Sequence, residues 1–186
     1  MLPFAYLLGT FPSAAIIARR QGVDITSSGS GNPGASNVSR VLGRRLGVLV
    51  FVLDGLKGAL CVLAGFIAFE YAGALALACA AVVGHVFPIT RHFKGGKGVA
   101  TAGGSVIALY PLIGVAMTLL WLGTTRVTRK ASLGSIAILI GFPISQAVTG
   151  RPAPEIATGI GLGVFVAWRH WPNIKRLVRG TEHTVR

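Results

Sequence analysis

The fold is decided by residues 46–70, LGVLVFVLDGLKGALCVLAGFIAFE, and by residues 72–90, AGALALACAAVVGHVFPIT, which follow almost at once. Each run is close to the roughly 20 apolar residues that a helix needs to cross a hydrocarbon core. Backbone polar groups in lipid must be satisfied within the protein, which leaves helices or a closed barrel. The runs are continuous and lack strand-type alternation, so they predict membrane-spanning helices.

The composition supports a membrane protein. Of the 186 residues, 52% are hydrophobic and 12% are charged, with 18 Lys or Arg against 5 Asp or Glu. Soluble domains carry about 25% charged residues, so a soluble globule is disfavoured. A nucleic-acid-binding protein would share the basic excess. Here, however, the cations gather between the apolar runs, so we expect a lipid bilayer and no nucleic acid as partner.

The remaining apolar runs set the topology. They span residues 2–18, 99–125, 132–149 and 155–168. The basic loops 91–97 and 126–130 can both be cytoplasmic only if the run 99–125 between them crosses the membrane twice. Tyr110 precedes a proline, which disfavours the helical region there. We therefore predict a single-domain (1–186) all-α integral membrane protein. It would have seven transmembrane helices, two of them short (98–109 and 111–125), with the N-terminus outside and the C-terminus cytoplasmic.

The first polar motif is SGSGNPGASNVSR, residues 28–40. Its glycines allow backbone amides to approach a ligand, and successive amides can form a nest for an anion. Hydroxyls, amides and an arginine add donors for phosphate oxygens. The alternative is a flexible polar loop. The candidate site residues here are Ser30, Gly31, Asn32, Gly34, Ser36, Asn37 and Arg40.

The second motif is HVFPITRHFKGGKGVATAGG, residues 85–104. We expect a helix to begin near Val99, and a helix N-terminus preceded by glycines and a lysine suits an anion. The motif is not a nucleotide-hydrolysing P-loop, because Gly98 stands where Ser or Thr is required. A basic anchor at lipid headgroups is the alternative. The candidates are Gly95, Gly96, Lys97 and Gly98, while His85 is expected to pack or to form hydrogen bonds.

Two further segments carry polar candidates. In TRVTRKASLGS, residues 125–135, Ser132 is a candidate ligand, although helix capping is the favoured interpretation. In RHWPNIKRLVRGTE, residues 169–182, His170, Asn173 and Arg176 recur on one helical face. A polybasic tail that binds anionic lipid is the alternative there.

Two charges lie inside an apolar run. Asp54 and Lys57 are spaced i, i+3, which allows an ion pair. Intramembrane charges are functional or structural pairs, and we expect a structural pair. The two cysteines form no CxxC or Cys/His spacing, so no metal site is expected.

Together these motifs resemble the signatures of the bacterial acyl-phosphate:glycerol-3-phosphate acyltransferase family. LDGLKG (53–58) and SLGS (132–135) extend the resemblance over nearly the whole chain. It implies a multi-pass enzyme of the bacterial inner membrane that needs no cofactor and has its active site at the cytoplasmic face. Such an enzyme transfers a fatty acyl group from acyl phosphate to the 1-hydroxyl of glycerol 3-phosphate. The products are lysophosphatidic acid and phosphate, in the first step of phospholipid biosynthesis, and a cytosolic acyl-phosphate-producing enzyme would supply the donor.

The expected chemistry needs several anion-binding groups. An acyl phosphate is already activated, so no Ser-His-Asp set is required. As a hypothesis, Ser30, Ser36 and Asn37 hold the acyl-phosphate head. Arg40, Lys97 and Asn173 hold glycerol 3-phosphate, supported by His170 and Arg176. Ser30, Arg40, Lys97 and Asn173 are the candidate catalytic residues. A transporter of organic phosphates is the alternative, although the chain shows none of the repeated halves of transporters.

Overall fold

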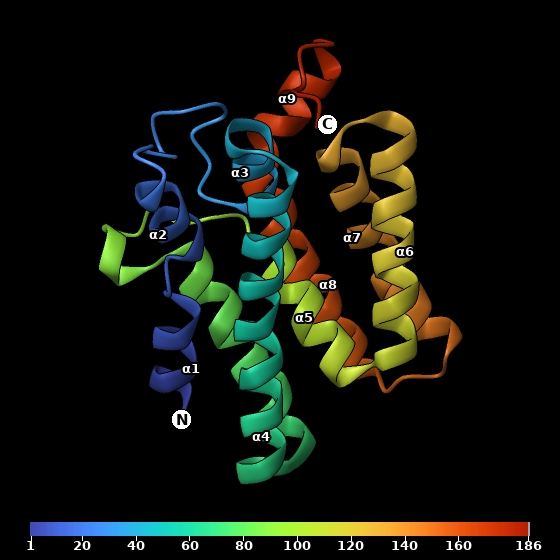
Figure 1. Cartoon of the computed structure of the whole chain (residues 1–186). Helices are drawn as coiled ribbons and strands as arrows, with labels where there is room; N and C mark the ends of the chain where they lie inside the picture. The colour runs from blue at the N-terminus through green and yellow to red at the C-terminus, as the bar shows by residue number, and fades with distance from the viewer. Residues whose placement is uncertain (186) are drawn as a thin grey trace. The chain divides into compact units, whose positions relative to one another are not determined.

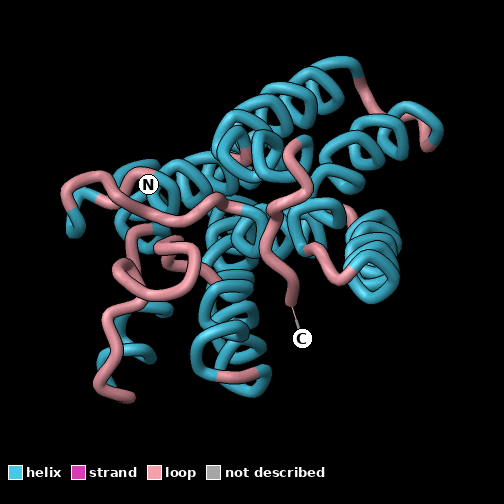
Figure 2. The backbone as a smooth tube through the Cα atoms, turned by 90° about the horizontal axis from the view of Figure 1, so that it is seen from above, coloured by secondary structure: helices cyan, strands magenta, loops and turns pink. Residues whose placement is uncertain are grey.

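The computed structural model describes residues 1–185, and all regular structure in this range is helical (Figure 1, Figure 2). The elements are α1 (Leu2–Gly9), α2 (Ser13–Arg20), α3 (Ala35–Leu42), α4 (Arg44–Val86), the 3-10 helix η1 (Ile89–Arg91), α5 (Val99–Leu109), α6 (Pro111–Thr128), α7 (Ala131–Val148), α8 (Ala153–Arg169) and α9 (Trp171–Val178). The predicted all-α fold class is therefore confirmed for these residues. The chain divides into two compact units, residues 1–111 and 112–185.

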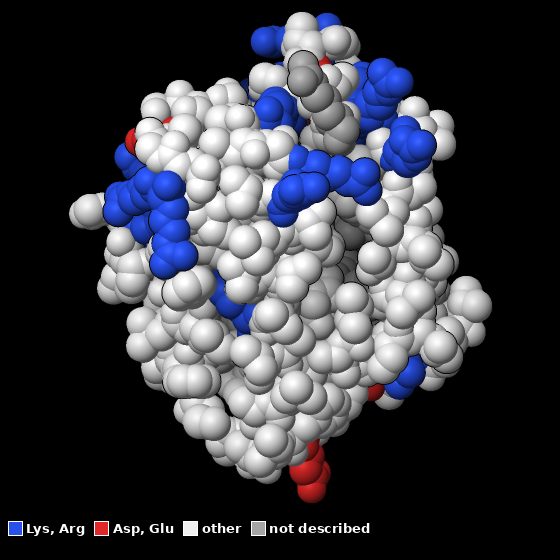
Figure 3. Space-filling view, viewed as in Figure 1, with Lys and Arg blue, Asp and Glu red and all other residues white. Residues whose placement is uncertain are grey.

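The described helices are suited to lipid. Within residues 1–185, three helical stretches are long and apolar enough to cross a membrane, namely Leu2–Arg20, Arg44–Arg91 and Ala131–Val148. Val99–Leu109 is apolar but shorter, as the sequence predicted. The space-filling view shows a broad uncharged surface over the helices (Figure 3). Exposed side chains such as Ile67 and Leu112 carry apolar surface that water would not favour.

The long element α4 is two helices joined by a sharp reversal. Phe69 and Glu70 leave the helical region, with φ 57° and ψ −152° at Glu70. The chain turns back at this point at the lower end of Figure 1. A Cβ at Gly65 would collide with the backbone of Ala74, so the two halves approach closely just before and after the turn. The turn predicted between the runs 46–70 and 72–90 is thus confirmed.

The apolar run 99–125 is interrupted as predicted. α5 ends at Leu109, α6 begins at Pro111, and Tyr110 between them has φ −139° and ψ 75°. The ring of Pro111 excludes the helical conformation at the preceding residue. Proline is tolerated at the first position of α6, because the amide there would have no helical partner in any case.

The first apolar run contains a break that the sequence analysis did not predict. An unbroken helix was expected over residues 2–18, but α1 ends at Gly9 and α2 begins at Ser13. Pro12 has no N–H to continue the ladder of α1. Nζ of Lys57 in α4 donates to two carbonyls released by the break, that of Gly9 at 3.3 Å and that of Phe11 at 2.9 Å.

Small residues bring α4 and α5 together in the unit formed by residues 1–111. A Cβ at Gly104 would collide with the carbonyl of Gly55, and one at Gly58 would collide with the carbonyl of Thr101. Close backbone approach through small residues is the usual way for helices to pack in lipid. α5 is therefore held against the first half of α4, and the loop before α5 is held with it.

Adjacent glycines of α5 provide a matched test of this packing. Gly104→Ala should lower the apparent unfolding temperature in detergent by several degrees, because overpacking costs about 1–3 kcal/mol. Gly103→Ala should leave it unchanged or slightly higher. A Cβ at Gly103 would meet nothing within 4 Å, and alanine is the better helix former. Equal unfolding temperatures for the two variants would contradict the close contact.

Candidate active site

The first polar motif is built around the side chain of Asn37 in α3. Asn37 is 1% exposed. Its Oδ1 accepts hydrogen bonds from the backbone N–H of Ser30 at 2.9 Å and from Nη1 of Arg40 at 3.1 Å. Its Nδ2 donates to the carbonyls of Ser28, at 2.9 Å, and Ile25, at 3.2 Å. The structure thus brings three predicted site residues together, with Asn37 shaping the loop from inside.

The rest of the motif keeps backbone groups accessible. Gly31 has φ +70°, and a Cβ there would lie 3.0 Å from the carbonyl oxygen of Thr26, so only glycine suits this position. Asn32, Gly34 and Ser36 are half-buried along the same segment. The loop continues into α3 from Ala35 onward, so the second half of the motif is helical and not a flexible polar loop. An anion facing this segment would meet both loop amides and the start of a helix.

The second motif has the predicted geometry at its helix. Gly98 is the N-cap of α5, with φ +88°, a left-handed conformation that favours glycine. α5 begins at Val99, as expected. Gly95, Gly96 and Gly98 are buried, while Lys97 between them is half-buried. The backbone N–H of Gly96 donates to the carbonyl of His85 at 3.1 Å, which ties the loop to the end of α4.

The two glycine-rich motifs share the wall of one small polar pocket. The pocket, of about 20 Å³, is lined by residues 9–14, Pro33, Asp54, His85, Pro88, Arg91, Gly95 and Gly96. A volume of this size has room for about one water molecule. Pro33 belongs to the first motif, and Gly95 and Gly96 belong to the second. The loop that carries Ser30 and leads into α3, where Arg40 lies, and the loop that carries Lys97 are thus neighbours within residues 1–111.

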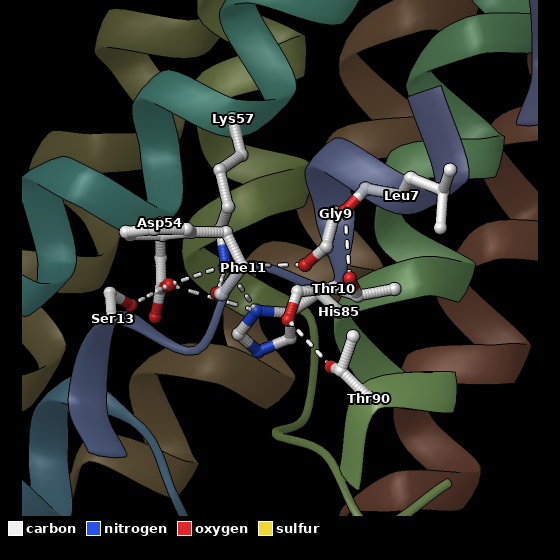
Figure 4. Close-up of polar contacts among 9 residues, drawn as sticks. All are labelled: Leu7, Gly9, Thr10, Phe11, Ser13, Asp54, Lys57, His85 and Thr90. Carbon is white, nitrogen blue, oxygen red and sulfur yellow. Dashed lines mark hydrogen bonds and ion pairs between the residues drawn. The ribbon is translucent and has the colours of Figure 1, made fainter. Parts of the chain in front are cut away.

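A buried ionic cluster lies at the back of this pocket (Figure 4). Lys57 Nζ is 2.7 Å from Asp54 Oδ1, which confirms the predicted ion pair. Ser13 donates to the same carboxylate oxygen at 2.5 Å. Nδ1 of His85 lies 3.2 Å from Lys57 Nζ, so His85 is a hydrogen-bonding residue, as expected.

In the unit formed by residues 112–185, the last motif is organised by a carboxylate that the sequence analysis missed. Nδ2 of Asn173 donates to Glu182 at 2.6 Å, and Nε of Arg176 donates to it at 2.8 Å. His170 is buried, with Nδ1 2.8 Å from the carbonyl oxygen of Val166. The signal was present in the sequence, because Glu182 is the single acidic residue of a strongly basic tail.

The pKa of Glu182 reflects this setting. Burial alone would raise the pKa of Glu182, but the hydrogen bonds from Asn173 and Arg176, with the charge of Arg176, lower it below its ordinary value. Glu182 is therefore ionised at neutral pH, and it fixes the orientation of two predicted site residues.

Ser132 does not cap α7, so the favoured interpretation of this residue was wrong. α7 begins at Ala131, its N-cap is Lys130, and no side chain caps it. Ser132 therefore lies inside the first turn of α7, where it is buried. The backbone N–H of Lys130, the N-cap residue, donates to the hydroxyl of Thr128 at 3.2 Å. No group of three or more His, Cys, Asp or Glu residues suited to a metal occurs within residues 1–185.

Comparison with known proteins gives a consistent match. The family model of glycerol-3-phosphate acyltransferases matches residues 1–180. A glycerol-3-phosphate acyltransferase from Aquifex aeolicus (strain VF5) is 42% identical over 182 residues, which cover 97% of this chain and 95% of that protein.

Two crystal structures of PlsY (YgiH), an integral membrane glycerol 3-phosphate acyltransferase, also resemble this chain. The glycerol 3-phosphate form has a TM-score of 0.94 and 41% identity, and the match covers 100% of this chain and 94% of that one. The lysophosphatidic acid form has a TM-score of 0.91 and 42% identity, with coverage of 98% and 92%.

Apolar helices joined by glycine-rich polar loops thus define an integral membrane protein. The chain belongs to the glycerol-3-phosphate acyltransferase family and is an integral membrane acyltransferase. The family predicted from the motifs is confirmed.

Asn37→Asp tests the internal role of the Asn37 amide. The carboxylate could still accept from Ser30 and Arg40, but its second oxygen would face the carbonyls of Ser28 and Ile25. We expect a loss of stability of about 1–3 kcal/mol and a fall in acyltransferase activity of about tenfold or more. Thermal unfolding in detergent and initial rates measure the two effects. A variant with wild-type stability would contradict the internal role.

Glu182→Gln tests the organisation of the last motif. Because the pKa of Glu182 is lowered in the folded protein, its ionised form stabilises the fold. That contribution is complete above the ordinary glutamate pKa, about 4.3, and is lost as the pH falls through the lower folded-state pKa. The variant should unfold at a lower temperature at neutral pH and should lose this part of the acid sensitivity. The same pH dependence of unfolding in both proteins would disprove the assignment.

Proposed function

We propose that this protein transfers a fatty acyl group from acyl phosphate to the 1-hydroxyl of glycerol 3-phosphate, giving lysophosphatidic acid and phosphate. The observation that carries the proposal is the match over the full chain to a relative solved in its glycerol 3-phosphate form, whose second structure is a lysophosphatidic acid form. The arrangement of the two glycine-rich motifs around one pocket supports it, because both substrates carry phosphate groups that need cationic and amide donors.

Acyl phosphate suits a site without a nucleophilic serine. Acyl phosphate is a mixed anhydride, so its carbonyl carbon can be attacked directly by the glycerol hydroxyl. In a Ser-His-Asp triad the histidine lies between the serine and the carboxylate. Here Ser13 donates directly to Asp54, and His85 faces Lys57. The cluster therefore does not have the geometry of a triad, and direct transfer is the simpler mechanism.

In the proposed reaction, the 1-hydroxyl oxygen forms a bond to the acyl carbon while the bond from that carbon to the phosphate oxygen breaks. The hydroxyl proton passes to the departing phosphate, so no protein base is required. Ser30, Ser36 and loop amides, shaped by Asn37, hold the acyl-phosphate head. Holding both substrates makes the attack effectively unimolecular.

Cationic groups stabilise the charge that develops on the carbonyl oxygen. Arg40 and Lys97 hold glycerol 3-phosphate, and Lys97 also faces the developing oxyanion. For residues 112–185, the sequence motif assigns Asn173 to glycerol 3-phosphate, with His170, Arg176 and Ser132 in support. The pairing of Asn173 and Arg176 with Glu182 would keep these donors in a fixed orientation.

We further propose the cellular setting implied by the family resemblance. The protein would form one catalytic domain in the bacterial inner membrane, with seven transmembrane helices, an external N-terminus and a cytoplasmic active site. The basic loops support this orientation by the positive-inside rule. A cytosolic enzyme that makes acyl phosphate would deliver the donor to that face.

Lys97→Ala tests the proposed reaction, with Lys94→Ala as the matched control in the same loop. Removing the half-buried Lys97 ammonium should lower phosphate release from acyl phosphate and glycerol 3-phosphate by about 100-fold or more. The exposed Lys94 should be replaceable with little effect. The assay uses purified protein in detergent, with acyl-CoA in place of acyl phosphate as a second donor.

Each outcome of this assay decides one point. Near-normal turnover by the Lys97 variant would refute its role. Product formation from acyl-CoA alone would reject acyl phosphate as the donor. Uptake of glycerol 3-phosphate by vesicles without acylation would favour a transporter.

A further inference from the structure

The ammonium group of Lys57 lies at the centre of the buried cluster in Figure 4. Besides Asp54, it approaches the carbonyl oxygens of Phe11 at 2.9 Å and Gly9 at 3.3 Å, and Nδ1 of His85 at 3.2 Å. Lys57 and Asp54 are 4% and 2% exposed. A lysine in apolar surroundings is expensive unless its hydrogen-bonding capacity is used, and here acceptors surround it.

These contacts position the ring of His85. Its Nδ1 lies 3.2 Å from Lys57 Nζ and 3.8 Å from Asp54 Oδ1, so this edge of the ring faces the ion pair. The Nε2 edge lies against Gly96, where an added Cβ would collide with this nitrogen. The ring therefore packs its Nε2 edge against the glycine-rich loop, while the backbone carbonyl of His85 accepts a hydrogen bond from the N–H of Gly96 at 3.1 Å.

One chain of contacts thus connects the helix break to the second motif. Lys57 binds the backbone of the unwound segment between α1 and α2, and it fixes the ring of His85. His85 holds Gly96 through its backbone and its ring. Gly96 is the residue before Lys97, so a shift of this loop would move the Lys97 ammonium.

We propose that Asp54, Lys57 and His85 are positioning residues for acyl transfer: they hold the loop Gly95–Gly98, and with it Lys97, in the place where it binds glycerol 3-phosphate. The inference rests on the proposed role of Lys97. On this proposal, the ion pair between Asp54 and Lys57 contributes to the affinity for substrate as well as to the stability of the helices. None of the three residues is required to touch the substrate.

A purely structural role predicts a different outcome. Removal of one member of a buried ion pair destabilises a protein strongly, whereas replacement of both members by neutral residues is often tolerated. The double variant Asp54→Asn with Lys57→Met, called here the charge-neutral pair, removes both charges and keeps similar side-chain volumes. A structural cluster would then leave kinetics intact in the folded variant, whereas a positioning cluster would not.

Two variants of His85 test the contact between the Nε2 edge of its ring and Gly96. In His85→Asn, the shorter side chain can keep an acceptor for Lys57 but leaves the space beside Gly96 empty. In His85→Gln, an amide group reaches toward the position of Nε2. We expect KM for glycerol 3-phosphate to rise about tenfold in His85→Asn and in the charge-neutral pair, with KM for acyl phosphate changed less than about threefold. His85→Gln should recover part of the affinity.

Tyr71→Phe is the control for loss of a hydrogen bond elsewhere in the same unit. The hydroxyl of Tyr71 donates to that of Tyr110 at 2.5 Å, at the opposite end of the second half of α4 from His85. This variant should lower the unfolding temperature without changing either KM. Binding of glycerol 3-phosphate alone, by calorimetry, separates this proposal from the proposed reaction. Weakened binding in His85→Asn supports positioning even if acyl phosphate is not the donor.

Two results would overturn the proposal. One is an unchanged KM for glycerol 3-phosphate in His85→Asn and the charge-neutral pair, each unfolding within roughly 3 °C of the wild type. The other is a loss of activity that follows the loss of folded protein in all three variants, His85→Gln included. In that case the cluster does no more than hold the fold.

Discussion

A helix broken inside an apolar segment is the constraint on which this structure depends. The break between α1 and α2 releases backbone carbonyl groups from the helical ladder, and a buried carbonyl without a partner is costly. Lys57 satisfies two of them, at Gly9 and Phe11, and Asp54 balances its charge. Asp54 and Lys57 of α4 thus hold the segment between α1 and α2, while α1 itself packs on α4 through an apolar cluster that includes Ala5 and Ala81. The Lys57 ammonium also contacts His85, and His85 contacts the loop that leads into α5.

Features that depend on neighbouring residues could be predicted from the sequence. The length of the apolar runs predicted the helices, and Pro111 predicted the interruption at Tyr110. Gly98 marked the start of α5, because a glycine before a helix provides the left-handed conformation found there. The i, i+3 spacing predicted the pair of Asp54 and Lys57. In each case the deciding interaction lies within a few residues along the chain.

Features that depend on distant partners could not be predicted. Pro12 was a local sign that the first apolar run could be interrupted. The carbonyl of Gly9 is bound by a lysine 48 residues away, so the sequence did not show which donor would pair the carbonyls released there. Asn37 was predicted to hold the acyl-phosphate head, and the sequence did not show that its Nδ2 donates to the carbonyls of Ile25 and Ser28, 12 and 9 residues earlier. Ser132 carried a residue type common at helix starts, yet α7 begins one residue earlier, at Ala131, and Ser132 falls inside its first turn. The residue types showed that these side chains would form hydrogen bonds. Which partner each side chain has depends on the fold.

Glu182 raises a question of electrostatics, because a carboxylate among cations weakens the attraction of the tail for phosphate. The geometry of the pair resolves it. Arg176 contacts Glu182 through Nε, which is one of the five N–H groups of a guanidinium. The planar group can therefore be fixed by a carboxylate and still offer donors to a second anion. A flexible arginine loses side-chain entropy when it binds a ligand, whereas one already held by Glu182 has lost much of that freedom on folding. The pair with Glu182 thus lowers the net charge near Arg176 but fixes the orientation of its guanidinium group, which suits the role proposed for Arg176 in support of glycerol 3-phosphate binding.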